Sequence, residues 1–250
     1  MTLTIQKRLV DYLEPLAADF TIADVRIGLG YTVVRLNNGQ AGVAWTPDSN
    51  AACCTHFPRA GTLVDSPAAK IVSLCADGHS ALARAVGLAT VNALLASLHR
   101  PSSIKEEVIA SLSITAEDRV AMVGHFGPIV SQLKSTGCRL DIIELIREKG
   151  ETLTPEQGKQ ALADCSVAII TGTSLINGTY DAVLAAVGNP RAAVLLGPST
   201  PFCPLVFSST KITHLAGAWV QDADRVLRIA SEGGGTMLMK PYVNFEHVLV

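Results

Sequence analysis

Charge of one sign and long unbroken apolar runs are both missing from this sequence. The 22 acidic and 20 basic residues leave a net charge of -2, which gives no electrostatic footprint for DNA or RNA. No run of Lys and Arg marks an anionic membrane surface. The apolar stretch 81–99 is interrupted by Arg84, Thr90 and Asn92, which predicts a buried helix rather than a membrane span. We therefore expect neither a nucleic-acid partner nor a membrane partner.

Charges are scattered through the apolar positions of the first twenty residues, a pattern that predicts no export signal there. The six cysteines stand at irregular positions (53, 54, 75, 138, 165 and 203). Together these observations predict reduced thiols and a cytoplasmic location. What the sequence does have is hydrophobic content: 48% of 250 residues can form a sizeable core in one large or two small domains.

Residues 1–102 are predicted to form a small α+β domain. Residues 5–17 carry apolar side chains at helical spacing, and residues 25–45 alternate as strands do, with a hairpin signal at NNGQ. The helix at 81–99 follows. Pro101 ends that helix and the next serines can cap another one, so the domain boundary is expected within 100–107.

Residues 103–250 are predicted to form a Rossmann-like α/β domain. Apolar runs without polar alternation indicate strands buried on both faces, and their alternation with helical segments indicates a parallel sheet. The order of the strands is left open. The strands are expected at 119–124, 139–145, 166–172, 192–197 and 212–217.

Small and hydroxyl residues gather where these strands are expected to end. In open parallel sheets ligands bind outside the carboxyl ends of the strands, and helix N-termini nearby favour anions. Turns and caps explain each loop singly, whereas several such loops at one edge predict a ligand site. The first three loops are expected to line one cleft that faces the N-terminal domain. The loops are GHFGP (124–128), TGTSLINGT (171–179), GPSTP (197–201) and AGA (216–218).

Six motifs of the chain resemble a family of uncharacterised prokaryotic proteins described as putative heavy-metal chelation proteins. The resemblance covers nearly the whole chain. It implies an enolase-N-terminal-like domain, without enolase activity, followed by a Rossmann-like domain, with an active site in the cleft between them. The motifs are VGLATVNAL, VGHFGPIV, IITGTSLINGTYD, VLLGPSTPFCPLVF, THLAGAWVQD and EGGGT.

The first strand-to-helix turn resembles a dinucleotide site without matching one. Gly124 and Gly127 bracket the turn, and Glu144 lies 20 residues after Gly124, where an acidic residue can bind a ribose hydroxyl. However, His125 and Phe126 stand where such a site needs a close-approach glycine. The sequence therefore predicts no stable NAD or ATP complex.

Two asparagines have alternative interpretations. Asn177 can bind a ligand or stabilise its own turn. Asn92, inside an apolar helix, needs a partner: either a helix-terminal or loop backbone group or, if it faces the interdomain cleft, a ligand. The ligand-binding candidates come from the helix at 81–99, the strand-end loops and the end of the second strand. They are Asn92, Gly124, His125, Phe126, Gly127, Glu144, Thr171, Gly172, Thr173, Asn177, Thr179, Gly197, Pro198, Ser199 and Thr200.

Signatures of metal and nucleophilic sites are weak. The segment CCTH (53–56) is a local cluster of soft ligands, while His125, Cys203 and His214 are candidate metal ligands from three strand-end segments. Ser199 does not stand in a nucleophile elbow. Two functions remain: binding or handling of a small ligand such as a metal ion or metal chelate, or an enzyme acting on a small anionic or nucleotide-like metabolite in the same cleft. A homo-oligomer is left open.

Overall fold

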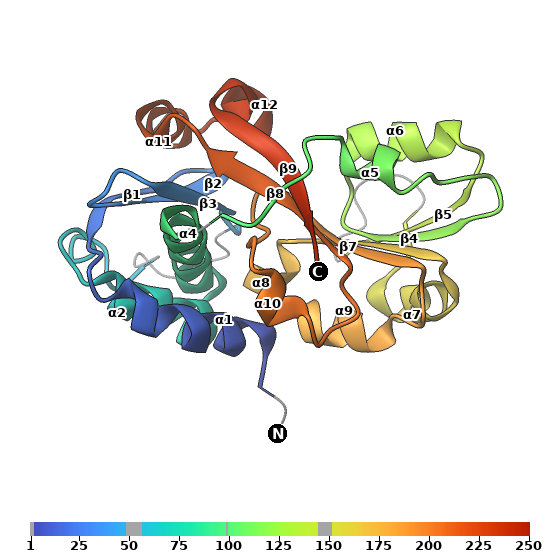
Figure 1. The fold of residues 1–250 in the computed structure, drawn as a ribbon, viewed down its shortest axis with the longest axis horizontal. Coiled ribbons are helices and arrows are strands. Elements are labelled where there is room, and N and C mark those ends of the chain that lie inside the picture. The colour runs from blue at the N-terminus through green and yellow to red at the C-terminus, as the bar shows by residue number, and fades with distance from the viewer. Residues whose placement is uncertain (1–2, 49–56, 99, 145–151) are drawn as a thin grey trace.

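The computed structural model describes residues 3–48, 57–98, 100–144 and 152–250 and contains two β-sheets (Figure 1). The first sheet is antiparallel, with the order β1-β2-β3. The second has the order β5-β4-β6-β7-β8-β9, in which β4 to β8 run parallel and β9 pairs antiparallel with β8. The predicted α/β class, with a small α+β part followed by a parallel-rich sheet, is confirmed. The strands are β1 (Ile22–Ile27), β2 (Tyr31–Leu36), β3 (Ala41–Trp45), β4 (Arg119–Val123), β5 (Arg139–Ile143), β6 (Val167–Thr171), β7 (Ala192–Leu196), β8 (His214–Val220) and β9 (Val243–Leu249).

Helices cover both sheets. Most are short, and α4 is the longest described helix. They are α1 (Ile5–Leu13), α2 (Ala68–Val72), α3 (Leu74–Asp77), α4 (Ala81–Ser97), α5 (Val108–Ser111), α6 (Gly127–Ser135), α7 (Pro155–Asp164), α8 (Ser174–Asn177), α9 (Tyr180–Ala186), α10 (Pro204–Phe207), α11 (Ala223–Ser231) and α12 (Thr236–Met239), with the 3-10 helices η1 (Glu14–Ala17) and η2 (Lys240–Tyr242). In the described part of the chain, no helix has the length and apolar character needed to cross a membrane.

The antiparallel sheet lies between α4 on one face and α11 on the other (Figure 1). Alternation along β2 explains this arrangement, because successive side chains of a strand point to opposite faces. Val34 belongs to the core cluster that contains α4, while Val33 belongs to the cluster that contains α11. The predicted hairpin is confirmed: β2 and β3 pair across a turn in which Gly39 has a φ of 86°.

Two glycines let α4 approach its neighbours at backbone distance. A Cβ atom on Gly42 of β3 would lie 2.3 Å from the carbonyl oxygen of Ala89, and one on Gly87 of α4 would lie 2.1 Å from the backbone nitrogen of Cys75. No side chain fits at such distances. The small residues of this helix therefore serve close packing against a strand and against α3.

The six-stranded sheet carries helices on both faces. Val167 and Ile169 of β6 face a cluster with α5 and α6, whereas Ala168 and Ile170 face the cluster that holds α7, α8 and α9. After β4 the chain places β5 on one side and β6 on the other. The order of strands therefore reverses at β4, and the carboxyl ends of β4 and β6 flank the switch point.

The structure differs from the sequence-based expectation at β8 and β9. The strand expected at 212–217 was predicted to end within the segment 216–218, but β8 continues to Val220, so Gly217 lies inside the strand. A Cβ atom on Gly217 would lie 2.9 Å from the carbonyl oxygen of Thr200, which explains the glycine by packing. Strand β9 was not expected, because the polar residues Asn244 and Glu246 interrupt its apolar pattern.

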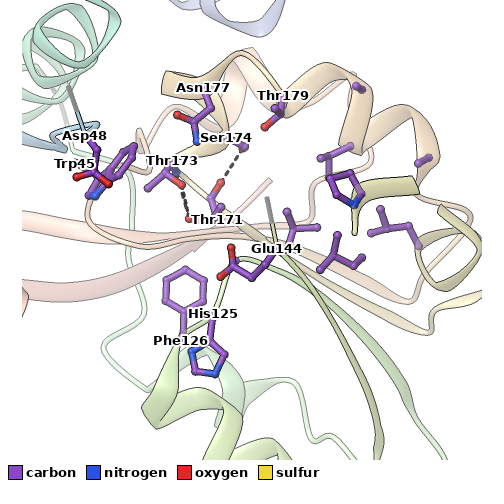
Figure 2. Close-up of a pocket in the computed structure, with 18 of the residues that line it drawn as sticks. Trp45, Asp48, His125, Phe126, Glu144, Thr171, Thr173, Ser174, Asn177 and Thr179 are labelled. Atoms are coloured by element: carbon purple, nitrogen blue, oxygen red, sulfur yellow. Dashed lines mark hydrogen bonds between the residues drawn. The ribbon is translucent and has the colours of Figure 1, made fainter. Parts of the chain in front are cut away.

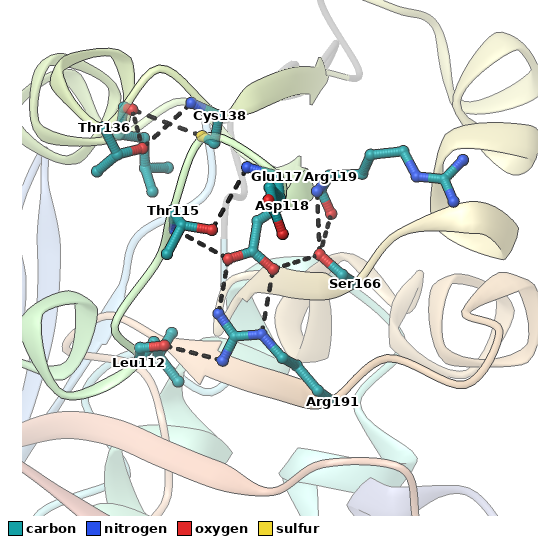
Figure 3. Close-up of polar contacts among 10 residues, drawn as sticks. Leu112, Thr115, Glu117, Asp118, Arg119, Thr136, Cys138, Ser166 and Arg191 are labelled. Atoms are coloured by element: carbon teal, nitrogen blue, oxygen red, sulfur yellow. Dashed lines mark hydrogen bonds and ion pairs between the residues drawn. The ribbon is translucent and has the colours of Figure 1, made fainter.

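An ion pair ties the start of β4 to the start of β7 (Figure 3). Arg191 donates Nε and Nη2 to the two oxygens of Asp118, at 3.1 and 2.8 Å, and donates Nη1 to the carbonyl oxygen of Leu112. Ser166 and the backbone nitrogen of Thr115 also donate to Asp118. These hydrogen bonds hold the pKa of the Asp118 carboxyl well below its usual value, and the bond from Arg191 has the largest effect.

The apolar core is continuous across the two sheets. One cluster of buried side chains includes Leu9 of α1, Leu88 of α4, Ile170 of β6 and Phe207 of α10. The division into residues 1–102 and 103–250 remains a prediction; it falls in the segment between α4 and α5.

Candidate functional site

A pocket of about 650 Å³ lies at the carboxyl ends of β4, β5 and β6, where the strand order reverses (Figure 2). Its other wall comes from the antiparallel sheet and α12. In Figure 2 the residues of 171–179 and those of 125–126 lie on opposite sides of Glu144. The described residues that line the pocket are Tyr31, Trp45, Asp48, Val123, Gly124, His125, Phe126, Ile143, Glu144, Pro155, Lys159, Leu162, Thr171, Thr173, Ser174, Asn177, Thr179, Ala182, Val183, Ala186 and Thr236.

The Phe126 ring occupies the space beside two of the strand-end glycines. A Cβ atom on Gly124 would lie 3.5 Å from Cε2 of Phe126, and one on Gly197 would lie 3.7 Å from Cε1. Both glycines have positive φ, at 95° and 114°, which ends their strands in a conformation that other residues rarely adopt. Here glycine provides the turns, and at Gly124 a Cβ atom would also come within 2.9 Å of the Cβ atom of Thr171, whereas its distance to the ring is an ordinary contact.

Three hydroxyls of the segment 171–179 hold its turn. The Thr171 and Thr173 hydroxyls lie 3.0 Å apart, and Ser174 donates to the carbonyl oxygen of Thr171 at 2.7 Å. Gly178, with a φ of 73°, ends the short helix α8. The left-handed position of this turn is thus occupied by Gly178, which leaves the side chain of Asn177 free of that task.

Asn177 and Thr179 line the pocket without a side-chain hydrogen bond to any described residue. Both are partly buried. Partly buried polar groups that have no partner in the protein are available to a ligand or to water.

Glu144 and His125 bring ionisable groups to the same pocket. Glu144 directly follows β5, His125 is the second residue after β4, and each is partly buried. Glu144 was expected near the end of the second strand, within 139–145, and in the structure it is the first residue after β5. A carboxylate and an imidazole can accept or donate protons and hydrogen bonds.

The antiparallel sheet and α12 contribute residues that the sequence did not single out. Trp45 ends β3, Asp48 follows it, and Tyr31 begins β2. The Tyr31 hydroxyl lies 2.7 Å from that of Thr236, and burial raises the pKa of Tyr31, partly offset by this hydrogen bond. No local pattern marks these residues, because β2 and β3 reach the pocket only through the tertiary fold.

The segment 197–200 lies beside the pocket and does not appear among its described lining residues. Ser199 and Thr200 are buried, and Ser199 accepts a hydrogen bond at 2.9 Å from the backbone nitrogen of Trp45. Gly172 is also buried, and a Cβ there would lie 2.9 Å from the Thr200 hydroxyl. Pro198 and Gly127 likewise fall outside the lining. In this structure these loop residues join the two sheets or shape the turns.

Asn92 meets its hydrogen-bonding requirement inside the protein. Its Nδ2 donates to the carbonyl oxygen of Val43 at 2.8 Å, and its side chain is buried between α4 and β3. It is not among the described lining residues. The sequence left open a helix-terminal or loop backbone group or a position facing the cleft, and the partner is instead the backbone of strand β3.

The three candidate metal ligands do not come together. His125 lines the pocket, Cys203 is buried, and His214 begins β8. Because β8 runs parallel to β4, its first residue lies at the opposite edge of the sheet from the carboxyl ends. Among the described residues, no group of three or more His, Cys, Asp or Glu side chains could hold a metal ion. The CCTH segment lies outside the described residues.

Comparisons with known proteins cover almost the whole chain. The model of the DUF364 family, described as "Putative heavy-metal chelation", matches residues 107–249, and that of DUF4213, with the same description, matches residues 10–95. The uncharacterized protein MJ0500 of Methanocaldococcus jannaschii is 25% identical over 243 residues, covering 94% of this chain and 93% of its own.

Two solved structures of DUF364 proteins with unknown function share the fold. The one from Pyrococcus horikoshii has a TM-score of 0.86 at 21% identity and covers 99% of this chain and 100% of its own. The one from Desulfitobacterium hafniense DCB-2 has a TM-score of 0.83 at 21% identity and covers 98% of each chain.

Proposed function

This chain belongs to the DUF364 family, which is described as "Putative heavy-metal chelation", and we propose that it binds a small ligand in the pocket at the β4–β6 switch point. A metal chelate is one example of such a ligand. The observation that carries the proposal is the pocket itself. Its size suits a small molecule, and its position is the one that ligands occupy in open parallel sheets. Asn177, Thr179 and Glu144 supply polar groups for orientation.

The donor set of the described residues favours a metal that arrives with its own ligands. His125, Glu144 and Asp48 are single donors from three segments, so a metal ion held by them would keep most of its coordination sphere for other ligands. Small-molecule recognition would then decide which complex is bound.

Native mass spectrometry with elemental analysis, on the protein purified from its own host, tests this proposal. We expect a bound mass above the 26.3 kDa of the chain. Ala182→Trp should abolish it by filling the pocket, because Ala182 is an exposed lining residue of α9. Ala185→Trp, exposed on the same helix but outside the lining, is the matched control. Absence of a bound mass in the wild type, or equal retention in both variants, contradicts the proposal.

An enzyme acting in the same pocket is the second candidate. It is favoured by the presence of His125 and Glu144 on one lining, since an imidazole and a carboxylate can share acid and base roles. Conversion of the released ligand by the wild type, and its loss in His125→Gln with binding retained, would support this function.

Two accompanying expectations remain predictions. The four described cysteines are free thiols, in keeping with a reducing cytoplasm. Size-exclusion chromatography with light scattering tests whether the chain forms a homo-oligomer.

A further inference from the structure

The charged groups of the described pocket lining are mostly acidic. Glu144, partly buried at the end of β5, and Asp48, exposed after β3, form no ion pair with another described residue. The one described cation on the lining is Lys159, and its Nζ lies 2.6 Å from the Glu156 carboxylate. That pair is exposed, so it screens Lys159 only weakly, and the balance rests on the count. With His125 neutral, two carboxylates (Glu144, Asp48) and one ammonium group (Lys159) give the described lining a formal charge of -1.

Three aromatic side chains line the same pocket as these carboxylates. Tyr31, Trp45 and Phe126 all line the pocket, from β2, β3 and the β4–α6 turn. The face of an aromatic ring carries negative potential and attracts ammonium and guanidinium groups. Rings also cover the apolar part of an organic molecule, which a bare ion lacks.

The remaining polar groups can all accept hydrogen bonds. The Asn177 amide oxygen and the Thr179 hydroxyl have no partner among the described residues. Both groups can also donate, but a protonated amine or guanidinium has several N–H donors and no acceptor, so it can use their oxygens together with the ring faces. An anion would instead meet Glu144 and the ring faces, both of which repel it.

We propose that the ligand of this pocket is a small organic cation, with its charged nitrogen held by Glu144 and its apolar body packed against Trp45 and Phe126. This inference rests on the proposed function, since it assigns a chemical class to the ligand of the same site. Helix N-termini alone would favour an anionic ligand. Glu144 stands at the same edge of the sheet as those N-termini, and its negative charge disfavours an anion there.

A matched pair of probes tests the sign of the charge. Phenethylamine and 3-phenylpropionate share an aromatic body and differ in charge, and their binding is measured by calorimetry. We expect the amine to bind at least roughly tenfold more tightly than the carboxylate, because like charges in a binding site are strongly disfavoured. Zinc chloride alone is the third probe, and it should not compete with the amine.

Two substitutions should change amine affinity in opposite directions. Glu144→Gln removes the charge and should weaken the amine roughly tenfold or more, the scale of a lost charge-assisted hydrogen bond. Asn177→Asp adds a charge and should strengthen it severalfold while weakening the carboxylate. Thermal melts show that both variants are folded, and Glu232→Gln, an exposed glutamate that ends α11, is the control that should leave affinity unchanged.

The results separate this inference from the proposed function. Three results would overturn the inference that the ligand is an organic cation. They are tighter binding of the carboxylate than of the amine, binding of neither probe, and an anionic ligand in protein purified from the host. If any ligand binds the wild type and is lost in Ala182→Trp, the proposed function stands even though the inference about its charge fails. Amine binding that survives Ala182→Trp takes place elsewhere and also overturns the inference.

Discussion

At the scale of single residues, the carboxylate of Asp118 has an unusually complete set of partners. It accepts two hydrogen bonds from Arg191, one from Ser166 and one from the backbone of Thr115 (Figure 3). Its side chain is 11% exposed, whereas that of Arg191 is 44% exposed. Water therefore screens the pair in part, and its contribution is smaller than that of a fully buried pair.

Asp118→Asn should lower the free energy of unfolding at pH 7 by about 1–3 kcal/mol, because Arg191 loses its charged partner. The pKa of Asp118 is lowered in the folded state, so its contribution is fully present above the unfolded pKa of about 3.9 and declines progressively as pH falls from there toward the lower folded pKa. Urea titrations at pH 7 and pH 3 should show the difference between wild type and variant shrinking in acid.

The exposed pair of Arg35 and Asp224 provides the control for this measurement. Its atoms lie 2.6 Å apart, but Asp224 is 81% exposed. Asp224→Asn should change the free energy of unfolding by about 0.5 kcal/mol or less. An equal effect of both substitutions would show that the partners of Asp118 contribute no more than a surface pair does.

The Phe126 ring bears on nucleotide binding. It lies beside Gly124 and Gly197, where a backbone would have to approach a pyrophosphate. We expect no NAD or ATP binding in calorimetry at micromolar protein and nucleotide concentrations. Micromolar affinity for either nucleotide would show that the ring moves aside or that the phosphates lie elsewhere.

At the scale of elements, helix α4 depends on glycine at its contacts. Gly87→Ala raises helix propensity by roughly 1 kcal/mol, yet its Cβ would lie 2.1 Å from the backbone nitrogen of Cys75. The clash should dominate and lower the free energy of unfolding by about 3 kcal/mol or more, which denaturant titration measures.

Gly235→Ala is the matched control for that substitution. Gly235 precedes α12 with a negative φ of -116°, and a Cβ atom there meets nothing within 4 Å. Its effect should stay within about 1 kcal/mol. A stable Gly87→Ala variant would mean that α3 can shift away from α4 at little cost.

At the scale of the whole molecule, the continuous core predicts cooperative unfolding. Leu9 and Leu88 share a cluster with Ile170 and Phe207, so the two sheets support one another. Scanning calorimetry should give one transition with equal calorimetric and van't Hoff enthalpies. Two separate transitions would instead show that residues 1–102 and 103–250 unfold independently.

The sequence predicted the five parallel strands, the hairpin and α4 because apolar periodicity and turn residues act locally. It could not predict strand order or β9, since edge strands with polar residues such as Asn244 depend on a neighbour. The lining of the candidate pocket could likewise be predicted only where it depends on local pattern. Strand-end residues such as Glu144 follow from the pattern, whereas Trp45 and Tyr31 reach the pocket through packing between distant segments.

The glycines at the strand ends have more than one explanation. Gly124 and Gly172 belong to the strand-end loops whose small residues were interpreted as the sign of a ligand site. In the structure Phe126 lies beside Gly124, and Thr200 lies beside Gly172. A missing Cβ leaves room for any neighbour, so the sequence alone does not tell a ligand from a side chain.

The pocket unites Tyr31 with Thr236, two residues that are far apart in an unfolded chain. A ligand of this pocket would therefore bind the folded protein and not the unfolded one, which at a concentration of 100 times Kd stabilises the fold by about 2.7 kcal/mol. Proteases in a cell attack the unfolded fraction, and that fraction would fall roughly a hundredfold. The lifetime of the protein would then follow the supply of its ligand, so that cells rich in the ligand accumulate the protein and starved cells degrade it.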